Sequence, residues 1–406
     1  MKILVLTDAF WPDQTGGISK SLLTEVEGLV TQGHSVVVVT RQLKKALPLH
    51  EAREGYELYR YPSPSKGTAL YRLYPLFSIR QIPKVVARLH GESHFNVAYV
   101  HNTFQAVGLT RCLQQIPYVY VLHAPTPREI EIDAAKGKYG LTTPLVKVVN
   151  HWIKAKERQA LTQAQAIIVR SKFTEEEMHK LYGDVGEGKT IRIPLCVDTQ
   201  RFSFVEDPRV IREELGLPLN RPILLTVRRL VARMGLENLI AAMSHVVKQV
   251  PEALLLIGGK GYLEERLRTQ ARQLNLETNV KFLGFIPEEK LPKYYQAADL
   301  FILPTMALEG FGLATIEALS CGTPVIATPV GANPEVLEPQ GEEFLCQDTT
   351  PEALAERIVW FIGQGICAEL RRRCRNYCET NFSITKVVSS IEEVLEAVSK
   401  GQNGSD

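Results

Sequence analysis

Short apolar runs alternate with helix-like segments along almost the whole chain. In the first half, runs of Val, Ile, Leu and aromatic residues predict buried β-strands at 2–7, 35–40, 97–101, 118–122 and 166–169. Runs that are apolar at every position are typical of parallel strands covered on both faces. A helical pattern over 18–32, followed by Gly33, connects the first two runs and predicts a βαβ unit.

A second series of the same kind begins near residues 195–205. Its predicted strands lie at 222–228, 253–259, 280–284, 300–303 and 324–327, again with helical segments between them. The two halves share an alternating α/β plan but no short repeat. Because 406 residues exceed what one hydrophobic core usually serves, we predict two doubly wound, Rossmann-like domains.

Composition narrows the choice of function. The hydrophobic content is 45%, the charged content is 23% and the net charge is +2, so there is no electrostatic case for nucleic acid binding. No apolar run approaches the length of a membrane-spanning helix, and the first predicted strand follows Met1 directly, so we expect a cytoplasmic protein. The seven cysteines are scattered and odd in number, which favours reduced thiols, and we assign no metal site.

The most informative motif runs from Glu309 to Glu317. The predicted strand 299–304 leads into a turn with Gly310 and Gly312, and a short helix is predicted from Leu313 to Ser320, ended by Gly322. The amides at a helix start suit a phosphate, so Phe311, Gly312 and Leu313 are assigned to donor binding. Glu317 would lean back toward that start and accept ribose hydroxyls, while Glu309 would face the group attached to the diphosphate. This arrangement predicts a sugar-nucleotide site.

The same segment resembles the E-x7-E signature of the family 4 retaining glycosyltransferases, which have the GT-B fold. Segments 12–18, 282–287, 293–299 and 330–335 also resemble that family. The resemblance implies two facing Rossmann-like domains with a cleft between them and a last helix that crosses back to the first domain. We therefore expect domains at 1–198 with 384–400 and at 199–383, and a flexible tail at 401–406.

Within that pattern, five residues of the first half are candidates, of which four lie just after predicted strands. Gly16 and Gly17 follow the first strand and would let a helix start approach the donor diphosphate, although a plain βα turn would also explain them. Asp13 in the same loop is an acceptor-binding candidate or an ordinary turn aspartate. His123 ends a strand and resembles the family's strand-end histidine, with hydrogen bonding to the transferred sugar as its expected role.

Glu129 lies downstream of His123 and is a second acceptor-binding candidate. The segment 134–161 is rich in Lys and Arg around Trp152, and 71–89 mixes aromatic, apolar and basic residues in a similar way. Such segments are typical either of a solvated helix face or of a peripheral contact with the inner face of a membrane.

The residues Arg228-Arg229-Leu-Val-Ala-Arg233-Met234 resemble the family's Arg…Lys pair, which neutralises the leaving diphosphate. Arg229 matches the arginine, but Met234 stands where the lysine is usual. We expect Arg233 to substitute for it, since a guanidinium binds phosphate bidentately. The open alternative is that Arg228 supplies the second charge.

The resemblance implies a retaining, metal-independent hexosyltransferase that moves a sugar from a UDP- or GDP-sugar to a hydroxyl of a glycan, lipid or lipid-linked saccharide. The nucleotide sugar is then a substrate, and no cofactor is expected. Glu309, His123, Arg229 and Arg233 are the catalytic candidates. A nucleotide-sugar epimerase, a phosphorylase and a noncatalytic carbohydrate-binding scaffold remain as alternatives on the same fold.

Overall fold

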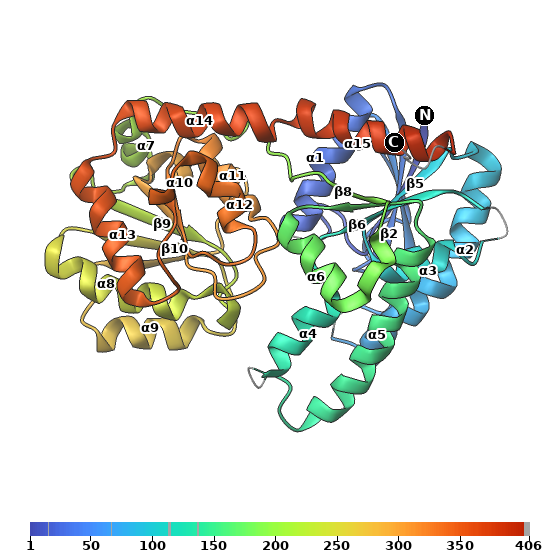
Figure 1. Cartoon of the computed structure of the whole chain (residues 1–406), viewed down its shortest axis with the longest axis horizontal. Coiled ribbons are helices and arrows are strands. Elements are labelled where there is room, and N and C mark those ends of the chain that lie inside the picture. Colours follow the sequence, from blue (N-terminus) through green and yellow to red (C-terminus); the bar gives the residue numbers. More distant parts are fainter. Residues whose placement is uncertain (15, 66, 113–114, 136–137, 402–406) are drawn as a thin grey trace. The chain divides into compact units, whose positions relative to one another are not determined.

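The computed structural model describes residues 1–14, 16–65, 67–112, 115–135 and 138–401. They form two compact units, residues 1–196 with the last helix and residues 197–383, and each is described by itself (Figure 1). The sequence placed this boundary at residue 198. Of the tail expected at 401–406, only Gly401 belongs to the described residues.

The first unit is built on an eight-stranded sheet with the order β3-β4-β2-β1-β5-β6-β7-β8. Its strands are β1 (Lys2–Leu6), β2 (Ser35–Gln42), β3 (His50–Arg53), β4 (Tyr56–Pro62), β5 (Val97–Val100), β6 (Tyr118–Leu122), β7 (Ala166–Val169) and β8 (Thr190–Arg192). All neighbours are parallel except β3 and β4, which pair antiparallel. The sequence pattern missed β3, β4 and β8 because polar residues interrupt them and β3 and β8 lie at the sheet edges.

Both faces of this sheet are buried, which explains the continuous apolar runs. In β1, Ile3 and Val5 pack in one core cluster, and Leu4 and Leu6 pack in another on the opposite face. The first cluster receives residues from α1 (Gly17–Thr31) and α15 (Ile384–Ser399). The second receives residues from α2 (Tyr74–Ser93), α3 (Thr103–Leu109), α5 (Thr143–Gln163) and α6 (Lys172–Tyr182).

The last helix therefore belongs to the first unit, although it follows the second unit in sequence. Helix α15 packs against α1 and against the strands β5 and β6 (Figure 1). A Cβ added at Gly28 of α1 would come within 2.6 Å of the Val388 side chain, so glycine permits this close helix contact. The remaining elements of the unit are α4 (Thr126–Ala135) and the 3₁₀ turns η1 (Ala69–Leu73), η2 (Gly140–Thr142) and η3 (Gly183–Gly186).

The second unit holds a five-stranded parallel sheet with the order β11-β10-β9-β12-β13. Its strands are β9 (Ile223–Val227), β10 (Leu254–Gly258), β11 (Val280–Gly284), β12 (Leu300–Leu303) and β13 (Val325–Ala327). Its helices are α7 (Pro208–Leu215), α8 (Leu236–Gln249), α9 (Glu264–Gln273), α10 (Leu291–Ala297), α11 (Leu313–Ser320), α12 (Asn333–Leu337), α13 (Pro351–Gln364) and α14 (Ala368–Phe382), with 3₁₀ turns η4 (Ala232–Met234), η5 (Glu338–Gln340) and η6 (Glu342–Phe344). The predicted helix 313–320 has the same bounds as α11.

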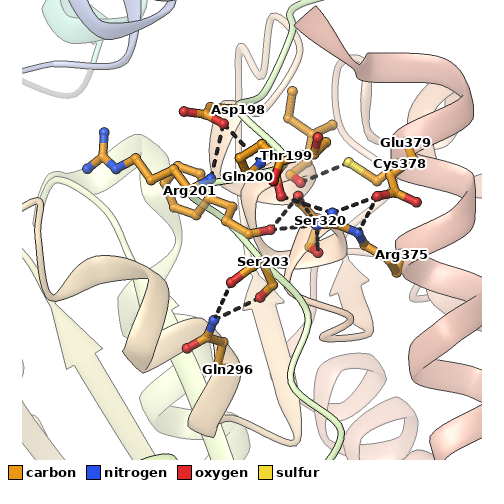
Figure 2. A network of polar contacts seen from close by, with 12 residues as sticks. Asp198, Thr199, Gln200, Arg201, Ser203, Gln296, Ser320, Arg375, Cys378 and Glu379 are labelled. Atoms are coloured by element: carbon orange, nitrogen blue, oxygen red, sulfur yellow. Dashed lines mark hydrogen bonds and ion pairs between the residues drawn. The ribbon is translucent and has the colours of Figure 1, made fainter.

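A polar network fixes the C-terminal end of α11 (Figure 2). Arg375 of α14 donates 2.7 Å hydrogen bonds from Nη1 to the backbone oxygens of Ser320 and Phe202, and a 2.9 Å bond from Nη2 to that of Thr199. The Ser320 hydroxyl donates to the same Phe202 oxygen at 2.7 Å. A cation at a helix C-terminus is also favoured by the helix dipole. The network therefore ties α11 to the segment 199–202 and to α14.

Among the described residues, no helix combines the length and the apolar character that crossing a membrane requires.

Candidate active site

Three side chains in the second unit form a compact hydrogen-bonded triangle. Arg228 directly follows β9, and Thr305 and Glu309 follow β12, the neighbouring strand. Arg228 donates from Nη2 to Glu309 Oε2 at 2.9 Å and from Nη1 to Thr305 Oγ1 at 2.9 Å. The Thr305 hydroxyl donates to the same Glu309 oxygen at 2.9 Å. Because ligands of open α/β sheets bind outside the strand ends, this triangle occupies the expected position for a site.

The triangle is largely withdrawn from water. The Arg228 side chain is 7% exposed and the Glu309 side chain is 14% exposed. Burial lowers the pKa of the Arg228 guanidinium, and the Glu309 carboxylate opposes this shift. A charge in such surroundings needs a partner of opposite sign, so each of the two groups stabilises the other.

The backbone on both sides of Glu309 is also held. Leu308 has a φ of 54°, an uncommon conformation for a bulky residue, and its carbonyl oxygen accepts a 3.2 Å hydrogen bond from Arg233 Nη1. The backbone carbonyl oxygen of Glu309 accepts a hydrogen bond from the Ala332 amide at 2.8 Å. A Cβ at Gly331, whose φ is +65°, would lie 2.2 Å from that oxygen. The loop therefore presents Glu309 in one fixed conformation.

The structure gives the three arginines different roles. Arg229 is exposed, whereas Arg233 is half-buried and holds the Leu308 carbonyl. Met234, at the position of the expected lysine, is buried. Sequence reasoning assigned Arg229 and Arg233 and kept Arg228 as an alternative for phosphate, but it missed the pairing of Arg228 with Glu309. That pairing depends on two adjacent strands that are distant in sequence.

Helix α11 begins at Leu313, directly after Gly312. Gly312 has a φ of 86°, and Leu313 and Ala314 after it are half-buried. Thr315 is 1% exposed, and its hydroxyl has no hydrogen-bond partner among the described residues. Phe311 instead packs its ring on Phe382 with a centroid distance of 5.6 Å, so only its backbone is available to a donor.

Glu317 is 3% exposed, as its apolar neighbours in the sequence suggested. The phenol of Tyr295, from α10, donates to Glu317 Oε2 at 3.0 Å. Burial and the Glu317 carboxylate raise the pKa of Tyr295 well above its usual value, so the phenol keeps its proton. If ribose hydroxyls bind Glu317 as predicted, they would share its carboxylate with the Tyr295 phenol. Tyr295 was not among the sequence candidates.

In the first unit, Gly16 and Gly17 lie at the start of α1, as predicted. Both are exposed, and a Cβ at Gly16 would meet no atom within 4 Å. Asp13 is different, because its carboxylate is 2% exposed and accepts hydrogen bonds from Arg60 Nε at 2.6 Å and Nη2 at 3.0 Å. This buried ion pair with Arg60 therefore stabilises the conformation of the backbone around Asp13. Glu129 lies in the first turn of α4 and is half-buried.

His123 directly follows β6 and is paired with a second histidine that the sequence analysis missed. His101 directly follows β5, the neighbouring strand, and its Nδ1 lies 3.1 Å from His123 Nε2. Burial and the nearby Arg170 lower the pKa of His123 to about 3. Burial also lowers the pKa of His101, and His123 adds to the shift. Both rings are consequently neutral at physiological pH, and His123 can serve as a hydrogen-bonding group.

A buried ion pair underlies the two histidines. Arg170, after β7, donates to Glu25 of α1 at 2.6 Å, and both side chains are at most 1% exposed. Tyr99 donates to Glu25 at 2.7 Å and stacks edge-on against His101. The positive charge of Arg170 disfavours protonation of His123, which contributes to its neutral state.

Other polar residues at the same strand ends also escaped the sequence analysis. Asp8, after β1, pairs with Arg41 of β2 at 2.7 Å and accepts from Gln105 at 3.2 Å. The Asp8 amide donates to Asn102 at 2.6 Å. Asp8 and Asn102 lie just beyond the predicted strands 2–7 and 97–101, and His101 is the last residue of the second, so their position at strand ends was the available signal.

No group of three or more His, Cys, Asp or Glu side chains with the arrangement of a metal site occurs among the described residues.

Solved structures share this architecture. The chain matches sucrose-phosphate synthase from Thermosynechococcus elongatus with a TM-score of 0.81 and 22% identity, over 98% of this chain and 99% of the other. It matches WaaG, a glycosyltransferase involved in lipopolysaccharide biosynthesis, with a TM-score of 0.72 and 17% identity, over 97% and 99%. At these identities the matches establish the fold, which is the GT-B fold of glycosyltransferases.

Family models match both halves of the chain. The model described as Glycosyltransferase Family 4 matches residues 15–201, and the model described as Glycosyl transferases group 1 matches residues 207–380. The chain belongs to this family of glycosyltransferases.

Two curated relatives align over most of their length. An uncharacterized glycosyltransferase of Methanocaldococcus jannaschii is 27% identical over 360 residues, 87% of each chain. A GDP-mannose-dependent alpha-(1-6)-phosphatidylinositol monomannoside mannosyltransferase of Mycolicibacterium smegmatis is 29% identical over 345 residues, 82% of each chain.

Proposed function

We propose that this glycosyltransferase moves a hexosyl unit from a nucleoside diphosphate sugar to an acceptor hydroxyl, with retention at the anomeric carbon and without a metal ion. The observation that carries the proposal is the Arg228–Thr305–Glu309 triangle, which fixes a carboxylate in the loop that leads to the start of α11. In this proposal the fixed carboxylate accepts hydrogen bonds from sugar hydroxyls, and the amides at the start of α11 bind the diphosphate.

Charge that develops on the leaving diphosphate is stabilised in this proposal by Arg229, Arg233 and the α11 amides. Arg229 is exposed and free to turn toward a ligand, whereas Arg233 would have to exchange its bond to the Leu308 carbonyl for one to phosphate. Preorganised hydrogen-bond donors of this kind commonly supply the largest part of the stabilisation of the transition state. The guanidinium groups need no proton transfer to act.

Glu309 and neutral His123 orient the sugar. Since His123 Nε2 faces His101, the Nδ1 atom of its neutral ring is the one proposed to hydrogen-bond a sugar hydroxyl. Gly16 is proposed to let the diphosphate approach the start of α1, since a Cβ added there would meet no atom within 4 Å. Retention is proposed through the leaving phosphate, which would take the acceptor proton on the same face of the sugar.

The donor and the acceptor are tested together. Purified protein is incubated with labelled GDP-mannose first, because the relative from Mycolicibacterium smegmatis depends on it, and then with UDP-glucose and UDP-N-acetylglucosamine. Glycan and lipid acceptors are added separately. Acceptor-dependent release of the nucleoside diphosphate supports transfer, epimerised donor supports the epimerase alternative, and no turnover with any donor contradicts the proposal.

Retention at the anomeric carbon and independence from a metal ion are each tested by a separate measurement. Nuclear magnetic resonance of the product reports the anomeric configuration, and an inverted product contradicts retention. Activity that survives an excess of EDTA supports a metal-independent reaction, whereas loss that is reversed by Mg²⁺ or Mn²⁺ contradicts it.

The role of Arg233 is tested by comparing Arg233→Ala with Arg229→Ala. If both bind the diphosphate, each change should lower kcat about 10- to 100-fold, as expected for loss of a charged hydrogen bond. An Arg233→Ala protein with unchanged kcat would show that Arg233 only supports the loop.

A further inference from the structure

An apolar groove in the first unit has no part in the site described so far. It has a volume of about 720 Å³, within the range of about 300–1,000 Å³ that is usual for ligand pockets. Most of its lining comes from three segments, which are η1 with the start of α2, helix α4, and the first half of α5, and Phe104 of α3 with Tyr139 and Thr142 completes it. Its lining includes Leu73, Tyr74, Ile130, Val149 and Trp152. The α4 and α5 helices extend away from the sheet of this unit (Figure 1).

The surface around the groove is unusually apolar. Four aliphatic side chains that line it, Leu73, Leu76, Leu145 and Val149, are 44–62% exposed, and Leu70 and Val148, close to them in sequence, are 54% and 69% exposed. Single exposed hydrophobic residues are ordinary, but a contiguous group marks a surface that binds another apolar body. The ring of Trp152 lies in the groove and stacks on Phe104 with a centroid distance of 5.6 Å.

The charge on two of the three walls has a single sign. Residues 69–89 contain Arg72, Arg80, Lys84 and Arg88 and no Asp or Glu, and residues 139–156 contain Lys147, Lys154 and Lys156 and no Asp or Glu. The third wall, α4, does carry acids. Two of them, Glu131 and Asp133, are paired with Arg128 and Lys138. Apolar side chains between clusters of cations favour an amphiphile with a negative head group.

We infer that the groove holds a hydrocarbon chain of an anionic phospholipid, and that this lipid carries the acceptor hydroxyl. Exposed leucine and valine side chains would enter the apolar layer of the membrane while Arg72, Lys147 and Lys154 contact its phosphates. This inference rests on the proposed function for the identity of the acceptor, but the binding itself can be measured without it.

The position of the groove relative to His123 supports an acceptor role. Thr126 lines the groove and is the first residue of α4, three positions after His123. Thr126 is fixed by hydrogen bonds from its hydroxyl and amide to the buried Glu157. A lipid whose chain fills the groove would thus reach the start of α4, three residues after His123.

The test uses Trp152 as a reporter. The chain contains three tryptophans, so Trp11→Phe and Trp360→Phe in the full-length protein leave Trp152 alone. This protein is mixed with vesicles of phosphatidylcholine, or of phosphatidylcholine and phosphatidylglycerol in equal amounts, in which the phosphatidylglycerol chains are plain or brominated. Bromine quenches tryptophan only at close contact. We expect binding to the mixed vesicles alone, and quenching of Trp152 by the brominated lipid.

Two variants separate the groove from general adsorption. Val149→Asp should weaken vesicle binding roughly tenfold, because it removes an apolar contact and adds a charge to the groove. Val210→Asp is the matched control, since Val210 is similarly exposed but lies on α7 of the other unit. Lys147→Glu should weaken binding to the anionic vesicles roughly fivefold or more, but leave quenching at saturation unchanged.

Four results would overturn the inference: no vesicle binding, equal binding to neutral vesicles, binding without quenching of Trp152, or self-association that Val149→Asp abolishes. The last would assign the groove to a second copy of the chain. Vesicle binding and quenching need no donor, so they stand even if sugar transfer fails. Conversely, transfer to a water-soluble acceptor without quenching would leave the proposed function intact and refute only the lipid.

Discussion

Glu309 in the second unit and His123 in the first unit are each held in one charge state, but by different interactions. In the loop, a carboxylate is kept charged because Arg228 and Thr305 bind it directly. At the edge, two histidines are kept neutral because burial and Arg170 disfavour their protonation. The first device fixes one conformation through an ion pair, and the second selects one protonation state. In the proposed reaction both groups orient the sugar, Glu309 as a fixed carboxylate acceptor and His123 as a neutral hydrogen-bonding group.

The largest effect is expected from breaking the ion pair. Arg228→Ala leaves Glu309 partly buried without its cation, which typically costs about 3–5 kcal/mol of stability. Displacement of the carboxylate should also lower kcat/KM more than 100-fold. Urea unfolding and steady-state kinetics measure the two effects.

Arg228→Lys and the double variant Arg228→Ala/Glu309→Ala are the controls. The double variant should recover part of the stability lost in Arg228→Ala, because no unpaired charge remains. Full activity of the Arg228→Ala protein would refute the role given to the triangle.

A smaller effect is expected at Glu317. Glu317→Ala removes a charged hydrogen-bond acceptor, worth about 1.5–3 kcal/mol, and should weaken nucleoside diphosphate binding roughly 10- to 100-fold. Isothermal titration with GDP and UDP measures this.

Tyr295→Phe distinguishes binding from support, because it removes the 3.0 Å bond to Glu317 but keeps the carboxylate. It should change nucleotide affinity much less than Glu317→Ala does. Equal losses in the two variants would mean that Glu317 acts only as a partner of Tyr295 inside the unit.

The glycines of the two regions sharpen the contrast. Gly331→Ala places a methyl group against the Glu309 carbonyl at a φ of +65°, so we expect it to cost about 1–3 kcal/mol of stability. Gly16→Ala has open space and an extended backbone, so unfolding should be nearly unchanged. If the diphosphate approaches Gly16 closely, the same change raises KM for the donor. An unchanged KM would exclude Gly16 from donor binding.

The smallest effect concerns pH. His123 has a lowered pKa of about 3 in the folded state, against about 6.5 in the unfolded chain, so the unfolded state binds more protons between these values. Its contribution to stability is therefore complete above pH 6.5 and is lost as the pH falls toward 3. At pH 5 we expect a loss of about 1–2 kcal/mol relative to pH 7.5.

His123→Gln should flatten this dependence, because glutamine does not titrate. Urea unfolding of both proteins at pH 5 and pH 7.5 gives the difference. The same slope in both proteins would show that His123 is not held neutral by folding.

Much of the segment from Glu309 to Glu317 could be predicted from the sequence, because the residues that define it are close together in the chain. The strand, the glycine turn and the helix around E-x7-E are contiguous, and Gly312 and Gly322 mark the two ends of α11. The apolar neighbours of Glu317 likewise indicated its burial. Phe311 shows the limit of local reasoning, since its partner Phe382 lies far along the chain.

The sequence by itself determined the alternation of strands and helices, the parallel buried sheets and the family, because these depend on apolar periodicity and on contiguous motifs. Only the tertiary structure decided which polar groups meet. The pairs Arg228–Glu309, Tyr295–Glu317, His101–His123 and Asp13–Arg60 each join residues from different elements. Such pairing is set by strand order and by the depth of burial, which no single segment encodes. For the same reason, the three segments that line the apolar groove were separately visible in the sequence as aromatic and basic patterns, and their meeting was not.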